Sequence, residues 1–165
     1  MIITNSELRI PNYQIRPARP EDVRPALDLA LRVFMAFEAP FYGPEAVGNF
    51  KHDVTENEAF ISACEKGGQL MHVAACGGEI VGTVAVKNRN HVCILFIDPA
   101  WHRKGIATAL MDAAIAAMGA DEVTVNSSPY GLPFYLRYGF VPTDTEQRLN
   151  GFVFTPMVFG RLRRS

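Results

Sequence analysis

The sequence predicts an α/β chain of the α+β kind, with a mixed, mostly antiparallel sheet of six or seven strands and helices on both faces. Three observations support this fold class. Apolar residues follow helical spacing over residues 21–37. Two glycine-containing turns, Gly77-Gly78 and Asn150-Gly151, each separate a pair of strand-like runs. A continuously apolar run at residues 92–97 precedes a second helical stretch.

Proline and glycine mark where the expected helices begin and end. Pro20 stands at the start of the first long helix and Pro40 beyond its end, because proline fits a first helical turn but cannot continue a helix. Gly43-Pro44 is expected to open a second helix, and Gly119 to end a later one. The other expected helices are residues 56–66, 104–118 and 133–138.

The expected strands are short runs bounded by turn residues. The run at residues 92–97 has no polar alternation, which is typical of a central strand covered on both faces. The other strands are expected at residues 13–16, 69–76, 79–87, 122–126, 145–149 and 152–159. We find no internal repeat or linker, so a single domain over residues 1–165 is expected.

Composition narrows the range of partners. The 165 residues carry a formal net charge of −1, which gives no overall attraction to nucleic acid or to an anionic membrane. No apolar run approaches the roughly 20 residues that a membrane-spanning helix needs. The three cysteines, Cys64, Cys76 and Cys93, match no metal-ligand spacing, so we expect reduced thiols, a cytoplasmic location and no metal.

The segment most informative about chemistry joins the apolar strand to the following helix. The strand ends at Asp98-Pro99, and Arg103-Lys104-Gly105 then leads directly into the helix. Such a turn directs free backbone N–H groups and the positive end of the helix dipole at one point, which favours a phosphate. An ordinary strand–helix crossover is the alternative, because one glycine before a helix is a weak signal.

Two stretches resemble the GNAT acetyltransferases. The run IDPAWHRKGIATALMDAAI is similar to the family's coenzyme A signature, Q/R-x-x-G-x-G/A, which falls on residues 102–107 with His102 in place of Gln or Arg. The run VNSSPYGLPFYLRYGF is similar to the family's later strand and short helix. The resemblance implies a GNAT-like sheet that splays between its fourth and fifth strands, and acetyl-CoA (coenzyme A) as co-substrate.

The resemblance also implies site residues. Main-chain groups of Leu95, Phe96 and Ile97 would pair with pantetheine. Tyr135 would bind the cofactor and protonate the departing thiolate. Ser128 stands where many relatives carry a cofactor-binding asparagine, and Asn126 would add contacts. The residues expected at the pyrophosphate are Arg103, Lys104, Gly105, Ile106, Ala107 and Thr108.

The general base is less clearly indicated. Glu38, near the end of the first long helix, and His91, at the start of the apolar strand, are the candidates. Without a catalytic role, Glu38 would be a solvated residue at a helix end, and His91 would be a polar residue at a strand edge. The residues expected to face the acceptor are aromatic with little acid, which favours an amine of a small molecule, amino acid or peptide over a polycation.

Two rival functions remain at this stage. One is a non-catalytic acyl-CoA-binding sensor, and the other is an interaction domain without a cofactor. The sequence leaves the oligomeric state open, with a homodimer among the outcomes.

Overall fold

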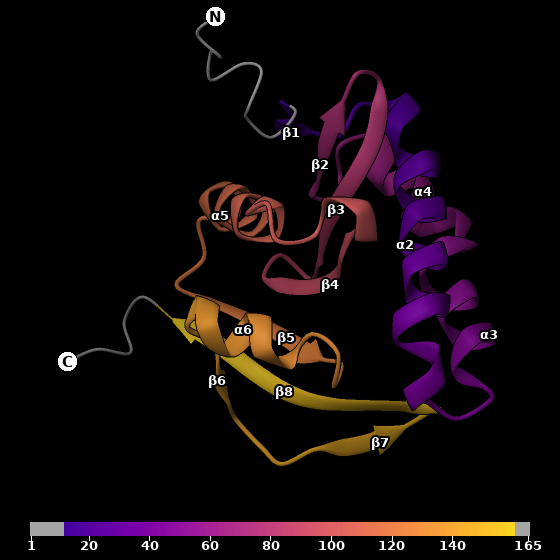
Figure 1. The fold of residues 1–165 in the computed structure, drawn as a ribbon, viewed down its shortest axis with the longest axis vertical. Helices are drawn as coiled ribbons and strands as arrows, with labels where there is room; N and C mark the ends of the chain where they lie inside the picture. Colours follow the sequence, from indigo (N-terminus) through magenta and orange to yellow (C-terminus); the bar gives the residue numbers. More distant parts are fainter. Residues whose placement is uncertain (1–11, 161–165) are drawn as a thin grey trace, which may run out of the picture.

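A computed structural model describes residues 12–160 of the chain. Its eight strands form one sheet in the order β1-β2-β3-β4-β5-β8-β6, with β7 paired to β8 beside this path (Figure 1). Every pair is antiparallel except β4 and β5, which are parallel. The strands are β1 (Gln14–Pro17), β2 (Met71–Cys76), β3 (Glu79–Lys87), β4 (His91–Ile97), β5 (Glu122–Ser127), β6 (Val141–Pro142), β7 (Gln147–Leu149) and β8 (Phe152–Gly160).

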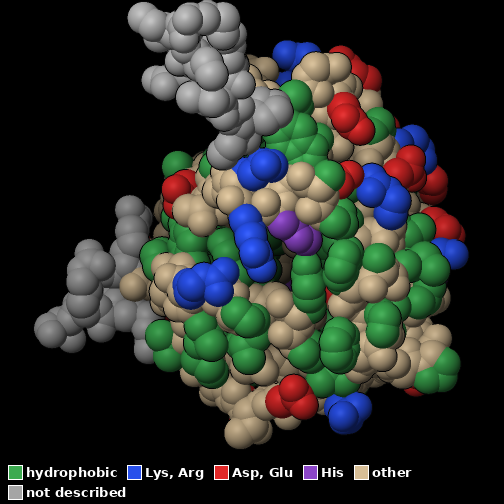
Figure 2. All heavy atoms as spheres, in the orientation of Figure 1, with side chains coloured by type: hydrophobic (Ala, Val, Ile, Leu, Met, Phe, Trp, Pro, Cys, Tyr) green, Lys and Arg blue, Asp and Glu red, His purple; other side chains and the backbone are tan. Residues whose placement is uncertain are grey.

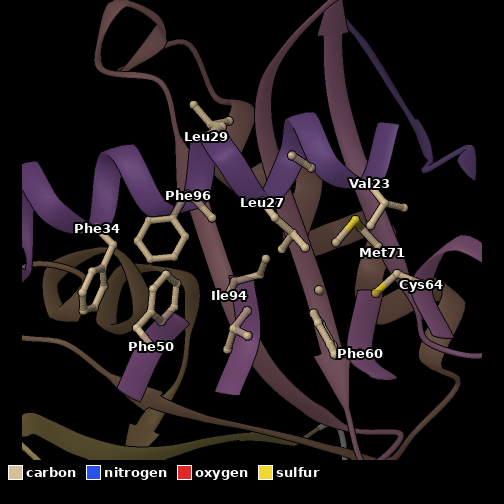
Figure 3. Close-up of a cluster of buried hydrophobic side chains, with 14 of the residues drawn as sticks. Val23, Leu27, Leu29, Phe34, Phe50, Phe60, Cys64, Met71, Ile94 and Phe96 are labelled. Carbon is tan, nitrogen blue, oxygen red and sulfur yellow. The ribbon is translucent and has the colours of Figure 1, made fainter. Parts of the chain in front are cut away.

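Helices cover both faces of the sheet. On one face α2 packs against β3 and β4, and on the other α5 packs against β2 and β3. Two separate clusters of buried hydrophobic side chains fill these two interfaces. Figure 3 shows the first cluster, in which Phe34 of α2 stacks on Phe50 with ring centroids 4.2 Å apart. The helices are α2 (Val23–Phe37), α3 (Ala46–Phe50), α4 (Glu58–Glu65), α5 (Ile106–Met118) and α6 (Leu132–Tyr138).

A partly buried ion pair fixes the start of α2 to β1. Arg16 of β1 binds Asp22, and their side chains are only 14% and 10% exposed. The Asp22 carboxylate also accepts the backbone N–H of Arg19 at 2.7 Å, in the short 3-10 turn before the helix. The amphipathic helix then runs to Phe37, so its far end brings Glu38 over the middle of the sheet.

The sheet opens between β4 and β5. Their pairing is limited to two positions, His91 with Thr124 and Val92 with Val125. Cys93 follows at once and has no partner in the β3–β4 register, which makes it the extra residue of a bulge. Because a bulge increases local strand twist, it helps to turn the rest of β4 away from β5. The splay expected between the fourth and fifth strands is therefore present.

Several boundaries differ from those expected. The segment after Gly43-Pro44 becomes helical at Ala46 and continues into a π-helical turn at Lys51–Thr55. Helix α5 begins at Ile106, two residues later than expected, because Gly105 has a φ of 81° that no helical residue adopts. Strand β6 adds a two-residue pairing, too short to leave a sequence pattern. No helix in the described part of the chain is long and apolar enough to cross a membrane.

Candidate active site

A cavity of about 490 Å³ lies in the opening between β4 and β5. It reaches from the end of α2, past β4, to the start of α5 and to α6. This size is typical of small-molecule sites. Figure 2 shows basic side chains close together on one face, beside hydrophobic side chains that border a hollow. Two basic residues, Arg103 and Arg137, line the cavity.

The turn before α5 presents main-chain donors to this cavity. Arg103 and Gly105 both have positive φ, 64° and 81°, so the turn is tightly wound around Lys104. Within residues 12–160, no oxygen accepts a hydrogen bond from the backbone N–H groups of residues 103–108. A Cβ added to Gly105 would meet no atom within 4 Å. The turn therefore has both the open space and the unpaired donors that a diphosphate requires.

The exposed edge of β4 offers further main-chain groups. Asp98 N–H donates to the Val81 carbonyl at 2.9 Å, so in the alternating antiparallel ladder Ile94 and Phe96 also turn their backbone groups toward β3. Leu95 and Ile97 therefore turn theirs toward the opening. An extended ligand arm could pair there like an added strand. Phe96, expected with them, contributes to the cavity wall with its backbone groups committed to β3.

His102, the residue that departs from the coenzyme A signature, has a specific partner. Its Nε2 lies 3.0 Å from the Ile97 carbonyl oxygen. Since that oxygen can only accept, Nε2 carries the proton in this contact. Its ring also lies beside that of Phe37 at the end of α2, with centroids 6.1 Å apart. His102 thus links the turn before α5 to β4 and to α2.

Glu38 lies on the opposite wall of the cavity, just after α2. Ser128 Oγ donates to its Oε2 at 3.0 Å, and Tyr42 OH donates to its Oε1 at 3.4 Å. Burial raises the pKa of this carboxyl to about 7, although both hydrogen bonds act to lower it. A carboxyl with a pKa near neutrality is well matched to general base catalysis at physiological pH.

Tyr135 lies in the same cavity, on α6, with 7% of its surface exposed. Its ring packs edge-on against Phe134 and Phe140, with centroids 5.4 Å and 5.3 Å away. Burial, followed by the nearby charge of Glu38, raises its pKa well above the usual range for a phenol. The phenol therefore stays protonated and can donate.

Most of the residues that the sequence singled out meet in this cavity. Two do not line it. Lys104 is not among the lining residues, and its carbonyl accepts from Tyr13 OH at 3.5 Å. His91 lies where β4 and β5 are still paired, and its Nδ1 is 2.8 Å from Thr124 Oγ1. Burial, followed by Lys87, lowers its pKa. The residues that do line the cavity are Glu38, Leu95, Phe96, Ile97, Arg103, Gly105, Ile106, Ala107, Thr108, Asn126, Ser128 and Tyr135.

Sequence reasoning missed part of the cavity wall. Trp101 and Arg137 stand inside the two motif runs but at positions without an expected role. Tyr130 also lies in the second run, and its ring stacks on Phe37 of α2 at 5.2 Å. Tyr42 also lines the cavity, and its contact with Glu38 has no counterpart among the expectations from the sequence. Among residues 12–160 no group of three His, Cys, Asp or Glu side chains could hold a metal ion.

Comparison with known proteins agrees with this geometry. Residues 38–160 match the family model of the acetyltransferase (GNAT) domain. The chain is 27% identical over 139 residues to the uncharacterized N-acetyltransferase YafP of Escherichia coli K12, covering 84% of this chain and 87% of that protein. It is 26% identical over 108 residues to the uncharacterized N-acetyltransferase MJ1207 of Methanocaldococcus jannaschii, covering 64% of this chain and 48% of that protein.

Solved structures show the same fold. A GCN5-related N-acetyltransferase from Rhodopseudomonas palustris superposes with a TM-score of 0.73 at 25% identity, over 89% of this chain and 94% of that one. The PaiA N-acetyltransferase from Thermoplasma acidophilum, solved with coenzyme A, superposes with a TM-score of 0.74 at 18% identity, over 90% and 99%. The chain belongs to the GNAT acetyltransferase family. Acetyltransferases of this family use acetyl-CoA.

Proposed function

We propose that this protein transfers the acetyl group of acetyl-CoA to the primary amine of a small molecule, an amino acid or a peptide, in the cytoplasm and by direct attack in a ternary complex. One observation carries the proposal. A single cavity is lined by the unpaired amides before α5, by the open edge of β4, and by both Glu38 and Tyr135. A cofactor arm and an acceptor amine can therefore meet inside it.

The two ionisable side chains suit opposite halves of the reaction. Bound acetyl-CoA supplies the thioester whose acyl group the amine attacks. Glu38, with its pKa of about 7, takes the proton that the acceptor must lose before it becomes nucleophilic. Tyr135 donates its proton to the departing sulfur, because burial keeps the phenol neutral.

The remaining residues position the cofactor. The amides of residues 103–108 and the Arg103 side chain hold the pyrophosphate. Backbone groups of Leu95 and the N–H of Ile97 pair with the pantetheine arm, while the Ile97 carbonyl accepts from His102. Asn126, on the β5 side of the opening, adds a polar contact.

The acceptor side of the cavity is mostly uncharged. Val33, Tyr42, Phe96 and Tyr130 line it around Glu38, which is the one carboxylate among the described lining residues. A single carboxylate suits one ammonium group. It offers no second partner to a polyamine or an aminoglycoside.

A screen of amine acceptors tests the proposal. Free thiol released from acetyl-CoA is measured for each amine, with hydrolysis without acceptor as the background. We expect thiol release with monoamines, amino acids or peptides that exceeds release with polyamines. Acetyl-CoA binding without thiol release in any reaction would instead favour the sensor.

A pair of tyrosine variants separates the catalyst from the sensor. Tyr135→Phe removes only the phenolic proton donor, so it should lower kcat about 100-fold while acetyl-CoA still binds. Tyr138→Phe is the matched control on the same helix, because its hydroxyl donates to Asp112 at the surface at 2.6 Å. Equal rates in the two variants would remove Tyr135 from the mechanism.

A further inference from the structure

The hydroxyl of Ser128 connects two parts of the active site that lie far apart in sequence. Ser128 follows β5, is 7% exposed, and donates from Oγ to Glu38 Oε2 at 3.0 Å. The same Oγ accepts the backbone N–H of Gly131 at 2.9 Å. Gly131 is the residue before α6, the helix that carries Tyr135. One side chain therefore ties the end of α2 to the start of α6.

The hydrogen-bonding capacity of Ser128 leaves little for a cofactor. A serine hydroxyl has one proton to donate, and here that proton goes to the Glu38 carboxylate. One of its two acceptor positions is taken by Gly131 N–H. A ligand carbonyl or phosphate needs a donor, and Ser128 has none left.

We propose that Ser128 is a positioning residue, whose hydroxyl holds the Glu38 carboxylate toward the acceptor amine and does not bind coenzyme A. This inference rests on the proposed function, because it assigns Ser128 a role in presenting the base. It departs from the expectation that Ser128 replaces a cofactor-binding asparagine.

The packing around Ser128 is consistent with a fixed position for this hydroxyl. A Cβ added to Gly131 would lie 3.3 Å from Ser128 Oγ and 3.2 Å from Tyr135 Cε2. The loop therefore approaches Ser128 closely only with glycine at this point. On the other side, Tyr42 OH donates to the second carboxylate oxygen of Glu38, so both oxygens are held.

Other ionisable groups share the cavity with Glu38. The phenols of Tyr42, Tyr130 and Tyr135 all have raised pKa values through burial, and burial raises the pKa of Cys93 to about 12. Arg103, Arg137 and His102 line the cavity from the side of α5 and α6. A readout specific to the Glu38 carboxyl is therefore needed, and nuclear magnetic resonance supplies it.

The test follows the Glu38 carboxyl in protein labelled with carbon-13 at the glutamate side chains, with the resonance assigned from Glu38→Gln. In the unmodified protein we expect a titration midpoint near 7. Ser128→Ala removes a hydrogen bond that favours the charged form, so the midpoint should rise by roughly one pH unit. Ser128→Thr, which keeps the hydroxyl, should restore it.

Ser127→Ala is the matched control. Ser127, the last residue of β5, is also buried, but its hydroxyl donates to the Ser128 carbonyl at 2.8 Å and makes no hydrogen bond to Glu38. Its midpoint should equal that of the unmodified protein. The Kd for acetyl-CoA, measured by calorimetry, should be unchanged in all three serine variants.

Two results would overturn the inference. An unmoved midpoint in Ser128→Ala shows that the hydroxyl does not hold the carboxylate. A raised acetyl-CoA Kd in Ser128→Ala, absent from Ser127→Ala, shows that Ser128 is a cofactor contact. The resonance measurement needs no turnover. If the acceptor screen fails, the proposed function is lost while the midpoints still decide how Ser128 and Glu38 are coupled.

Discussion

Gly105 and Gly67 share one backbone conformation at opposite ends of two different helices. Their φ angles are 81° and 80°, and a Cβ added to either would meet no atom within 4 Å. Gly105 precedes α5 inside the cavity, whereas Gly67 follows α4, away from the lining residues. A side chain is disfavoured by the positive φ at both positions, but only Gly105 lies at the proposed cofactor site.

Alanine at Gly105 should therefore weaken cofactor binding specifically. Both Gly105→Ala and Gly67→Ala should lower the free energy of unfolding by roughly 1 to 2 kcal/mol, because a side chain is disfavoured at positive φ. At Gly105 the methyl group also occupies space in front of the amides. The Kd for coenzyme A should rise about tenfold or more there, the effect of losing one charge-assisted hydrogen bond. Calorimetric titration that shows equal Kd values in both variants would contradict the proposed phosphate site.

Replacement of Glu38 by glutamine should remove the base while retaining the side-chain shape. We expect kcat to fall about 100-fold or more. In the unmodified enzyme kcat/KM should increase as the pH rises through about 7, because the carboxylate form acts, and then level off. Glu38→Gln should lose this dependence. Glu79→Gln, at the exposed first residue of β3, serves as the control. A rate profile with the same rise in Glu38→Gln would point to another base.

Asp22 should contribute to stability in a pH-dependent way. The hydrogen bond from Arg16 lowers its pKa below the ordinary 3.8, so its contribution is fully present above that value and is lost as the pH falls through the folded-state pKa. Asp22→Asn leaves the partly buried Arg16 guanidinium without its counterion. It should lower the free energy of unfolding by about 2 kcal/mol near neutral pH, the size of a lost hydrogen bond to a charged group. Urea unfolding measures this free energy, and Asp28→Asn, at an exposed position, is the control. An equal decrease in the two variants would refute the role of the ion pair.

His72 should make the protein sensitive to mild acid. It is 9% exposed, its Nδ1 has no partner among the described residues, and burial lowers its pKa from 6.5. As the pH falls, the unfolded chain therefore takes up a proton at His72 before the folded protein does. The free energy of unfolding decreases as the pH falls from 6.5 toward the pKa of His72 in the folded protein. His72→Leu should make the free energy of unfolding less dependent on pH in this range. Some dependence should remain, because the pKa of His91 is also lowered. Urea unfolding at several pH values checks the slope, and an unchanged slope would exclude His72 as its source.

Local patterns predicted the parts of the structure that depend on neighbouring residues. Some features depend only on residues close together in the chain, so the sequence predicts them. They are the helical spacing before Phe37, the turn at Gly77-Gly78 and the glycine before α5. The splay between β4 and β5 followed from a resemblance to known acetyltransferases. The bulge at Cys93, which accompanies it, left no pattern in an apolar run.

Contacts between segments far apart in the chain could not be predicted from local sequence patterns. Glu38 and Ser128 are 90 residues apart, and their hydrogen bond depends on where the end of α2 lies over the loop after β5. His102 departs from the signature, and its bond to the Ile97 carbonyl appears only once β4 and the turn are placed together. Thus the sequence indicated Glu38 as a candidate, while the partners that orient it required the fold.

The short pairing between β4 and β5 has a consequence for the protein without its cofactor. Beyond Val92 the backbone of β4 is a strand edge inside the molecule. Such an edge has unpaired N–H and C=O groups that can pair with an extended ligand. An occupant of the groove would cap that edge. Cofactor saturation should therefore slow amide hydrogen exchange at Leu95, because a bound pantetheine arm would occupy the N–H that otherwise faces the open groove.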